Sequence, residues 1–249
     1  MPENLPWRTV WVTGASTGIG REIVLQLAAA GVKVAASARS AERLAGLGGN
    51  VLAVPLDVTD ASSTRTAVDL IESKLGPVDL AIFGAGTYAP VDVNSINPAD
   101  FAHMMTTNYM GVVNCLAALA PRMTEQGRGH ISWIASVAGY AGLPKAAAYG
   151  PTKAALINLA ESLYPEFRRQ GVRISVINPG FVETPLTAQN DFEMPFLMKA
   201  DEAARRTIEG LASGRFEVAY PRRFAAILKF ARLLPYPLFF KLIDKAILK

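Results

Sequence analysis

Short β-branched or aromatic runs alternate with segments of helical periodicity along most of this chain. The runs predict strands at residues 9–13, 32–37, 51–56, 78–83, 130–135 and 173–178. Residues 78–83 are almost continuously apolar, which is typical of a parallel strand buried on both faces. This alternation predicts an α/β fold: one doubly wound parallel sheet of about seven strands, with helices on both faces.

A glycine-rich turn joins the first predicted strand to the first predicted helix. Glycines allow the backbone to approach a pyrophosphate, and the free N–H groups at the helix start face it. A tight turn without a ligand is the alternative, but the strand before the turn and the helix after it favour a dinucleotide site of the Rossmann type. Its candidate residues are Gly14, Ser16, Thr17, Gly18, Ile19 and Gly20.

The end of the second predicted strand bears on the choice of dinucleotide. An acid there would bind the ribose 2′-hydroxyl of NAD, whereas a basic residue favours the 2′-phosphate of NADP. The chain has Ser37-Ala38-Arg39-Ser40 and no acid, and Arg39 lies nineteen residues past Gly20. A solvated surface arginine is the alternative, but the missing acid predicts NADP, with NADPH preferred over NADH.

Tyr149 and Lys153 are four residues apart in a predicted helix that ends near Gln170. Both side chains then lie on one face, one turn from each other. An ammonium beside a phenol stabilises the phenolate and should move the tyrosine pKa toward neutral pH. This pair predicts an acid/base for a carbonyl or alcohol oxygen, although a surface Tyr and Lys on an ordinary helix is a common alternative.

Composition excludes several other classes. The single cysteine, Cys115, rules out an internal disulfide and suggests a reducing compartment, so we expect a cytoplasmic location. His103 and His130 are far apart in sequence, and no metal site is expected. No basic, apolar leader begins the chain, and no uncharged apolar run reaches the roughly 18 residues of a membrane span.

The order and spacing of these motifs resemble the short-chain dehydrogenase/reductase family over about residues 7–221. The matching pieces are Thr13-Gly14-x-x-x-Gly18-x-Gly20, Asp57, Ala85-Gly86, Asn108, Ser136, Tyr149-x-x-x-Lys153, and Pro179-Gly180 followed by Thr184. One departure is Phe83-Gly84-Ala85-Gly86, where many members have Asn-Asn-Ala-Gly. The missing asparagine usually braces the central strands, so its loss should affect stability more than chemistry.

The resemblance implies a catalytic tetrad. Tyr149 would be the acid/base, and Lys153 would bind the nicotinamide ribose and lower the Tyr149 pKa. Ser136 would hydrogen-bond the substrate oxygen, and Asn108 would kink its helix and hold a water that relays protons to Lys153. Further cofactor contacts are implied for Asp57, Val58, Ala85, Gly86, Pro179, Gly180, Val182 and Thr184.

The resemblance also places the substrate under residues 181–198. This segment is rich in apolar side chains and offers no obvious clamp for a phosphate or carboxylate, so we expect an apolar substrate, and a lipid-like one if the tail of the chain contacts a membrane. The alternative is that these side chains only pack on the body of the protein. The candidate substrate residues are Ser136, Val137, Tyr140, Leu143, Phe181 and Leu186. The chain is thus expected to be an NADP(H)-dependent oxidoreductase that reduces a carbonyl or oxidises the matching secondary alcohol.

Residues 222–249 form a basic, amphipathic tail. They hold seven Lys or Arg and one acid, Asp244, so the tail carries +6 and the rest of the chain −2 of the net +4. We expect two helices there, broken at Pro235-Tyr236-Pro237. Three roles stay open: contact with the inner face of an anionic membrane, a subunit interface in a homodimer or homotetramer, and a flap over the substrate pocket.

The whole chain, 1–249, is interpreted as one domain with a core over 7–221 and this tail. Nucleic acid binding is not expected, because the basic charge is confined to an apolar tail. Two alternatives to an enzyme remain: an NADPH-binding sensor with negligible turnover, and a membrane-docking scaffold on the same fold.

Overall fold

The computed structural model describes residues 5–48, 50–191 and 193–247, and seven of its strands form one parallel sheet in the order β3-β2-β1-β4-β5-β6-β7. The strands are β1 (Thr9–Thr13), β2 (Lys33–Ala38), β3 (Val51–Pro55), β4 (Leu80–Phe83), β5 (Gly129–Ile134), β6 (Val172–Pro179) and β7 (Glu217–Tyr220). The order reverses between β1 and β4, which places the topological switch point at the carboxyl ends of those strands.

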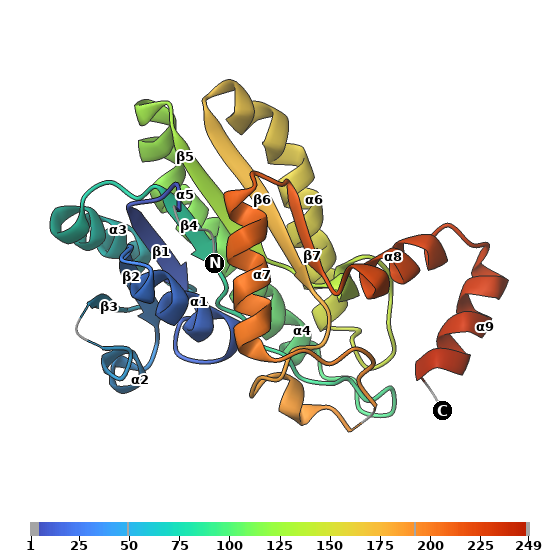
Figure 1. The fold of residues 1–249 in the computed structure, drawn as a ribbon. Helices are drawn as coiled ribbons and strands as arrows, with labels where there is room; N and C mark the ends of the chain where they lie inside the picture. Colours follow the sequence, from blue (N-terminus) through green and yellow to red (C-terminus); the bar gives the residue numbers. More distant parts are fainter. Residues whose placement is uncertain (1–4, 49, 192, 248–249) are drawn as a thin grey trace.

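Helices cover both faces of the sheet, as the sequence predicted (Figure 1). One face carries α3 (Ala61–Leu75), α5 (Gly111–Gln126) and α6 (Tyr149–Arg169), which pack around Trp11 and Trp133. The other carries α1 (Gly18–Ala29), α2 (Ala41–Ala45) and α7 (Ala200–Ala212), which pack around Val12 and Ile82. All four of these strand residues are almost fully buried, so the sheet is the common centre of two apolar cores.

Two helix starts are set by side-chain caps that the sequence indicates. The Asp60 carboxylate accepts from the Ser62 N–H at 2.8 Å and begins α3. Asn97 accepts from the Ala99 N–H at 3.1 Å and begins α4 (Pro98–Met104). Each cap satisfies a backbone donor that has no partner within the helix.

The helical segment that follows Asn97 is not one continuous α-helix. A π-helical turn at Met105–Met110 separates α4 from α5, and Asn108 lies inside it. A π-helical turn adds a residue to the helical repeat and redirects the side chains within it, and such turns are frequent at functional sites.

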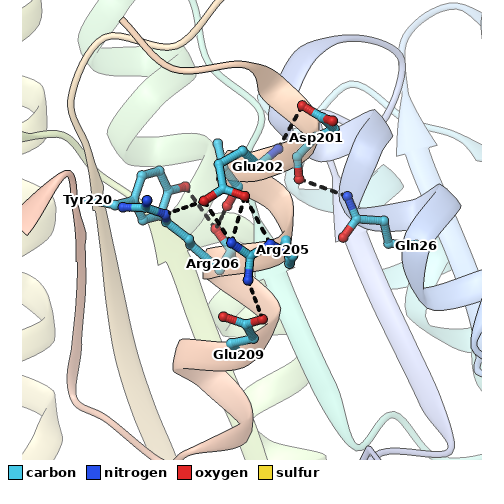
Figure 2. A network of polar contacts seen from close by, with 9 residues as sticks. Gln26, Asp201, Glu202, Arg205, Arg206, Glu209 and Tyr220 are labelled. Carbon is cyan, nitrogen blue, oxygen red and sulfur yellow. Dashed lines mark hydrogen bonds and ion pairs between the residues drawn. The ribbon is translucent and has the colours of Figure 1, made fainter. Parts of the chain in front are cut away.

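Polar contacts join helix α7 to α1, and others connect side chains within α7 (Figure 2). The Gln26 side chain donates to the Asp201 backbone oxygen at 2.8 Å. Arg205 pairs with Glu202 at 2.7 Å and with Glu209 at 2.6 Å. These pairs are solvent-exposed and contribute only a few tenths of a kcal/mol each, so the buried apolar face of α7 provides most of its attachment.

The tail forms two helices beyond β7, α8 (Arg222–Ala231) and α9 (Tyr236–Ile247), separated near Pro235. Figure 1 shows both helices extending from the β7 edge, away from the rest of the chain. The expected second helix included Leu248 and Lys249, which lie outside the described residues. Within the described ranges, none of the helices has the length and apolar composition needed to cross a bilayer.

Candidate active site

The four tetrad candidates come from three separate parts of the chain. Tyr149 is the first residue of α6, Lys153 lies one turn later, and Ser136 follows the end of β5. Asn108 lies in the π-helical turn. The contacts below show that these elements bring all four side chains together at the carboxyl end of the central strands, where open α/β sheets bind ligands.

The Tyr149 phenol is held in a largely apolar environment. Burial raises its pKa to about 12, a side-chain hydrogen bond with Ser136 acts in the opposite direction, and nearby Tyr88 raises it further. The two tyrosine rings meet edge to face, with centroids 5.2 Å apart. At neutral pH, therefore, Tyr149 is a neutral phenol that can donate a proton.

Lys153 is 5% exposed, and burial lowers the pKa of its ammonium to about 8. Its Nζ donates to the Ile134 backbone oxygen at 2.9 Å and lies 5.3 Å from the centroid of the Tyr149 ring. The sequence predicted that this lysine would move the tyrosine pKa toward neutral pH. In the structure the Tyr149 pKa shifts the other way, because desolvation of the phenolate is the larger effect.

Asn108 is fully buried and uses its side-chain amide to join the loop at Thr87 to helix α6. Its Oδ1 accepts from the Thr87 N–H at 2.7 Å, and its Nδ2 donates to the Thr87 carbonyl at 2.9 Å and to the Thr152 hydroxyl at 3.2 Å. A Cβ on Gly86 would lie 3.2 Å from Asn108 Oδ1 and 3.8 Å from Lys153 Nζ. The absence of a side chain at Gly86 thus lets Asn108 and Lys153 share one site.

The glycine turn fits a bound pyrophosphate. Thr17 caps α1 without a side-chain hydrogen bond, so the first N–H groups of the helix stay available to an anion. Gly14 has φ 71°, and a Cβ there would lie 2.5 Å from the Gly84 carbonyl oxygen. A Cβ on Gly20 would lie 2.4 Å from the Gly14 carbonyl oxygen. Gly14 therefore lets the turn pack closely against the backbone at Gly84, and Gly20 lets the start of α1 pack against the turn. This packing leaves the first N–H groups of α1 facing the site where a ligand would bind.

The residues predicted to contact the adenosine lie at the ends of β2 and β3. Arg39 is exposed directly after β2. The Asp57 pKa is held below its usual range, first by hydrogen bonds from the backbone and hydroxyl of Thr59 and also by the charge of Arg39. The charge of Arg39, at the end of β2, thus acts on Asp57, beyond the end of β3.

Thr184 lies next to Gly18 of the glycine turn. A Cβ on Gly18 would lie 2.8 Å from Thr184 Cγ2. The preceding loop is fixed by Val182, which pairs with Met198 in a parallel bridge, and by Gly180, whose N–H donates to the Tyr220 carbonyl at 2.7 Å. Thr184 therefore lies directly against the glycine turn, where the pyrophosphate is expected.

An apolar pocket of about 100 Å³ opens beside Tyr149. Five predicted substrate residues line it: Ser136, Val137, Leu143, Phe181 and Leu186. The sixth, Tyr140, is not among the residues that line the pocket. Its hydroxyl donates to Glu217 of β7 at 2.6 Å. Tyr140 thus braces the pocket wall from behind instead of facing the pocket.

Tyr88 and Asn190 also line the pocket, and neither was identified from the sequence. Tyr88 lies five residues after the end of β4, in a loop without regular secondary structure. The position of Tyr88 after the carboxyl end of a strand could have suggested a place near the site. The residue pattern does not show in which direction the loop turns.

The tail helix α8 supports the pocket from outside. Phe181, which lines the pocket, stacks on Phe224 of α8 with centroids 5.8 Å apart. Lys229 of α8 pairs with Glu217, the residue that also binds Tyr140 and, at 2.9 Å, Asn178. Three roles were considered for the tail: a membrane contact, a subunit interface and a flap over the substrate pocket. The position of α8 beside the pocket agrees with the last of these.

The departure at Phe83 is compensated by packing. Its ring meets Trp11 edge to face at 5.4 Å and is buried in the core between the central strands and α3, α5 and α6. The Thr13 hydroxyl accepts from the N–H groups of Gly84 and Ala85 at 3.1 and 3.3 Å. These contacts join β1 to the end of β4.

Comparisons with known proteins agree with this geometry. The family model described as short chain dehydrogenase matches residues 8–194. An uncharacterized oxidoreductase of Myxococcus xanthus (strain DK1622) is 38% identical over 243 residues, which cover 95% of this chain and 96% of the relative.

Solved structures give the same result. A short-chain dehydrogenase/reductase from Burkholderia phymatum in complex with NAD has a TM-score of 0.81 and 25% identity, covering 89% of this chain and 92% of the other. A short-chain dehydrogenase from Burkholderia cenocepacia J2315 in complex with NADP has a TM-score of 0.79 and 25% identity, covering 91% and 98%. The chain therefore belongs to the short-chain dehydrogenase/reductase family, which consists of oxidoreductase enzymes on an NAD(P)-binding Rossmann fold.

Proposed function

We propose that this enzyme is an NADPH-dependent carbonyl reductase, or in reverse a secondary-alcohol dehydrogenase, for an apolar substrate. The observation that carries the proposal is the arrangement at the pocket. A neutral tyrosine that is hydrogen-bonded to Ser136 and lies one turn from a buried lysine faces an apolar cavity at the carboxyl edge of the sheet.

Each tetrad residue has a role that its contacts support. Bound NADPH supplies the hydride that the substrate carbonyl carbon receives. Tyr149 donates its phenolic proton to the carbonyl oxygen, and the Ser136 hydroxyl hydrogen-bonds to that same oxygen. Lys153, held by the Ile134 carbonyl, lies beside the Tyr149 ring, where its charge stabilises the phenolate left after proton transfer.

Asn108 acts as a positioning residue in this proposal. It holds the loop at Thr87 and the helix at Thr152 in a fixed relation, and so sets the space beside Lys153. A water in that space would link Lys153 to solvent and restore the proton on Tyr149.

The cofactor preference rests on Arg39. An exposed guanidinium at the end of β2, with no acid in the segment 37–40, suits the 2′-phosphate of NADP. The related structures are in complex with NAD in one case and NADP in the other, so both cofactors fit this fold.

The substrate class rests on the lining of the pocket. Val137, Leu143, Phe181 and Leu186 supply apolar surface, and none of the residues that line the pocket carries a full charge. An apolar ketone or aldehyde fits such a pocket better than a phosphorylated or carboxylated one.

We further propose that the chain works as one domain, with a catalytic core at 7–221 and the tail at 222–249. The assembly would be a cytoplasmic homodimer or homotetramer. The oligomer is tested by sedimentation velocity and the domain organisation by limited proteolysis.

The test of the activity is NADPH oxidation, followed by absorbance, over short- and long-chain aldehydes and ketones. We expect turnover that is faster with NADPH than with NADH and that rises with the apolar surface of the substrate. Tyr149→Phe should lower kcat by at least a hundredfold, since it removes the proton donor but keeps the ring. Its control is Tyr109→Phe, a tyrosine of the π-helical turn to which no role is assigned.

Tight NADPH binding without turnover of any carbonyl would contradict the proposal and favour the sensor. Equal turnover by Tyr149→Phe would also contradict it. Faster turnover with NADH would remove the role given to Arg39.

A further inference from the structure

The two tail helices carry an exposed apolar surface. Half of the exposed large apolar side chains in the described residues fall within the sixteen residues 227–242. Phe230 is 66% exposed and Leu233 is 81% exposed. We call this set the tail surface: Ile227, Phe230, Leu233, Tyr236, Leu238, Phe240 and Leu242. A cluster of this kind on a soluble fold marks an interaction site.

The tail surface is distinct from the faces that hold the two helices in place. Helix α8 already buries Phe224 and Leu228 against Val137 and its neighbours. Helix α9 buries Phe239 and Ile243 against Ala141 and Ala231. Each helix therefore has an inner apolar face that fixes it to the body, and further apolar side chains that stay exposed.

Exposed cations lie in the same segment of the chain as the tail surface. Arg222, Arg223, Arg232 and Lys241 are all exposed. Among the side chains that the structure describes, none forms an ion pair with these four cations, and the acid nearest in sequence before α8, Glu217, is paired with Lys229. The tail as a whole carries +6. An apolar surface with cations in the same segment suits a partner that is apolar inside and anionic at its surface.

We propose that α8 and α9 dock this enzyme on an anionic lipid bilayer, with the tail surface in the headgroup region. At 1.5 Å per residue, helices of 10 and 12 residues are about 15 and 18 Å long, so they lie along the bilayer surface and cannot cross it. A second copy of the chain fits less well, because a two-fold interface through the tail surface would bring the same cations face to face.

The docked surface lies close to the catalytic pocket. Phe224, on the inner face of α8, touches Phe181 of the pocket wall. It also lies 5.9 Å from the ring of Phe196, which is itself exposed. One helix therefore has the pocket wall on one side and the lipid-facing surface on the other. If the proposed function holds, an apolar substrate reaches the pocket from the membrane.

The experiment is co-sedimentation of the full chain with sucrose-loaded vesicles of phosphatidylcholine alone or mixed 2:1 with phosphatidylglycerol. We expect binding to the mixed vesicles, weaker binding to the neutral ones, and a loss of binding at 0.5 M NaCl. Phe230→Ser combined with Leu233→Ser should lower the partition coefficient at least tenfold. Arg222→Gln combined with Arg223→Gln should lower it roughly fivefold per charge.

The matched control is Leu70→Ser, an exposed leucine on α3 at the other side of the molecule (Figure 1), which should bind like wild type. Tyr149→Phe should also bind vesicles like wild type, although it should lose turnover. The test of membrane docking is therefore independent of the test of catalysis. No binding to anionic vesicles, or the same loss in Leu70→Ser, would overturn the proposal. A dimer that dissociates in the Phe230→Ser, Leu233→Ser variant, without any vesicle binding, would assign the tail surface to a second copy.

Discussion

Lys153 makes the stability of this enzyme depend on pH in a way that Lys153→Met should abolish. Burial lowers the lysine pKa from 10.5 to about 8, so between those values the unfolded chain binds more protons than the folded one. Stability therefore rises with pH over that interval. From pH 7 to pH 10 the contribution is about 2–3 kcal/mol in the free energy of unfolding.

The assay is urea unfolding followed by far-ultraviolet circular dichroism at pH 7, 8.5 and 10. Lys153→Met also loses the hydrogen bond to the Ile134 carbonyl, but that loss does not vary with pH. The informative quantity is therefore the difference in slope between wild type and variant. Lys74→Met, at an exposed lysine of α3, is the control and should keep the wild-type slope.

Parallel stability curves for wild type and Lys153→Met would refute the reasoning. They would mean that the ammonium is solvated in the folded protein. A wild-type free energy that falls between pH 8 and pH 10 relative to Lys153→Met would refute it as well, because the sign would then be that of a stabilised charge.

Three further changes test other contacts. Gly14→Ala should destabilise the fold by about 1–3 kcal/mol, because its Cβ would meet the Gly84 carbonyl at 2.5 Å, whereas Gly142→Ala, in open space, should be neutral by thermal melting. Asn108→Ala should cost about 2–3 kcal/mol in urea unfolding, since it leaves both backbone groups of Thr87 without a buried partner. Arg39→Ala should raise the KM for NADPH about tenfold with little change for NADH; equal effects on both cofactors would contradict its assignment.

The sequence predicted the regular part of the fold well. Strand signals at 9–13 and 51–56 correspond to β1 and β3 within one residue, because each has β-branched or apolar residues and a clear end. The cap at Asp60 has a local sequence signal, because its carboxylate binds a backbone N–H only two residues away. The strand β7 (Glu217–Tyr220) was not located, since its four residues are too few for a periodic signal.

The site was predicted less evenly. Motif spacing placed Ser136, Tyr149 and Lys153, and the structure brings them together. The predicted direction of the Tyr149 pKa shift was wrong, because spacing shows a neighbouring charge and does not show desolvation. Tyr140 was placed in the pocket, but its orientation depends on Glu217, which is 77 residues away. Contacts at such separation have no local signal.

The stacking of Phe181 on Phe224 has a consequence for how this enzyme can diversify. The wall of the pocket is supported by a helix that begins after the last strand, and that helix contributes no residue to the tetrad or to the glycine turn. A change in the chain's last helices can therefore alter which molecules are accepted while the reaction chemistry stays intact. Exchanging the carboxyl-terminal segment between relatives is, for this architecture, a direct route to new selectivity.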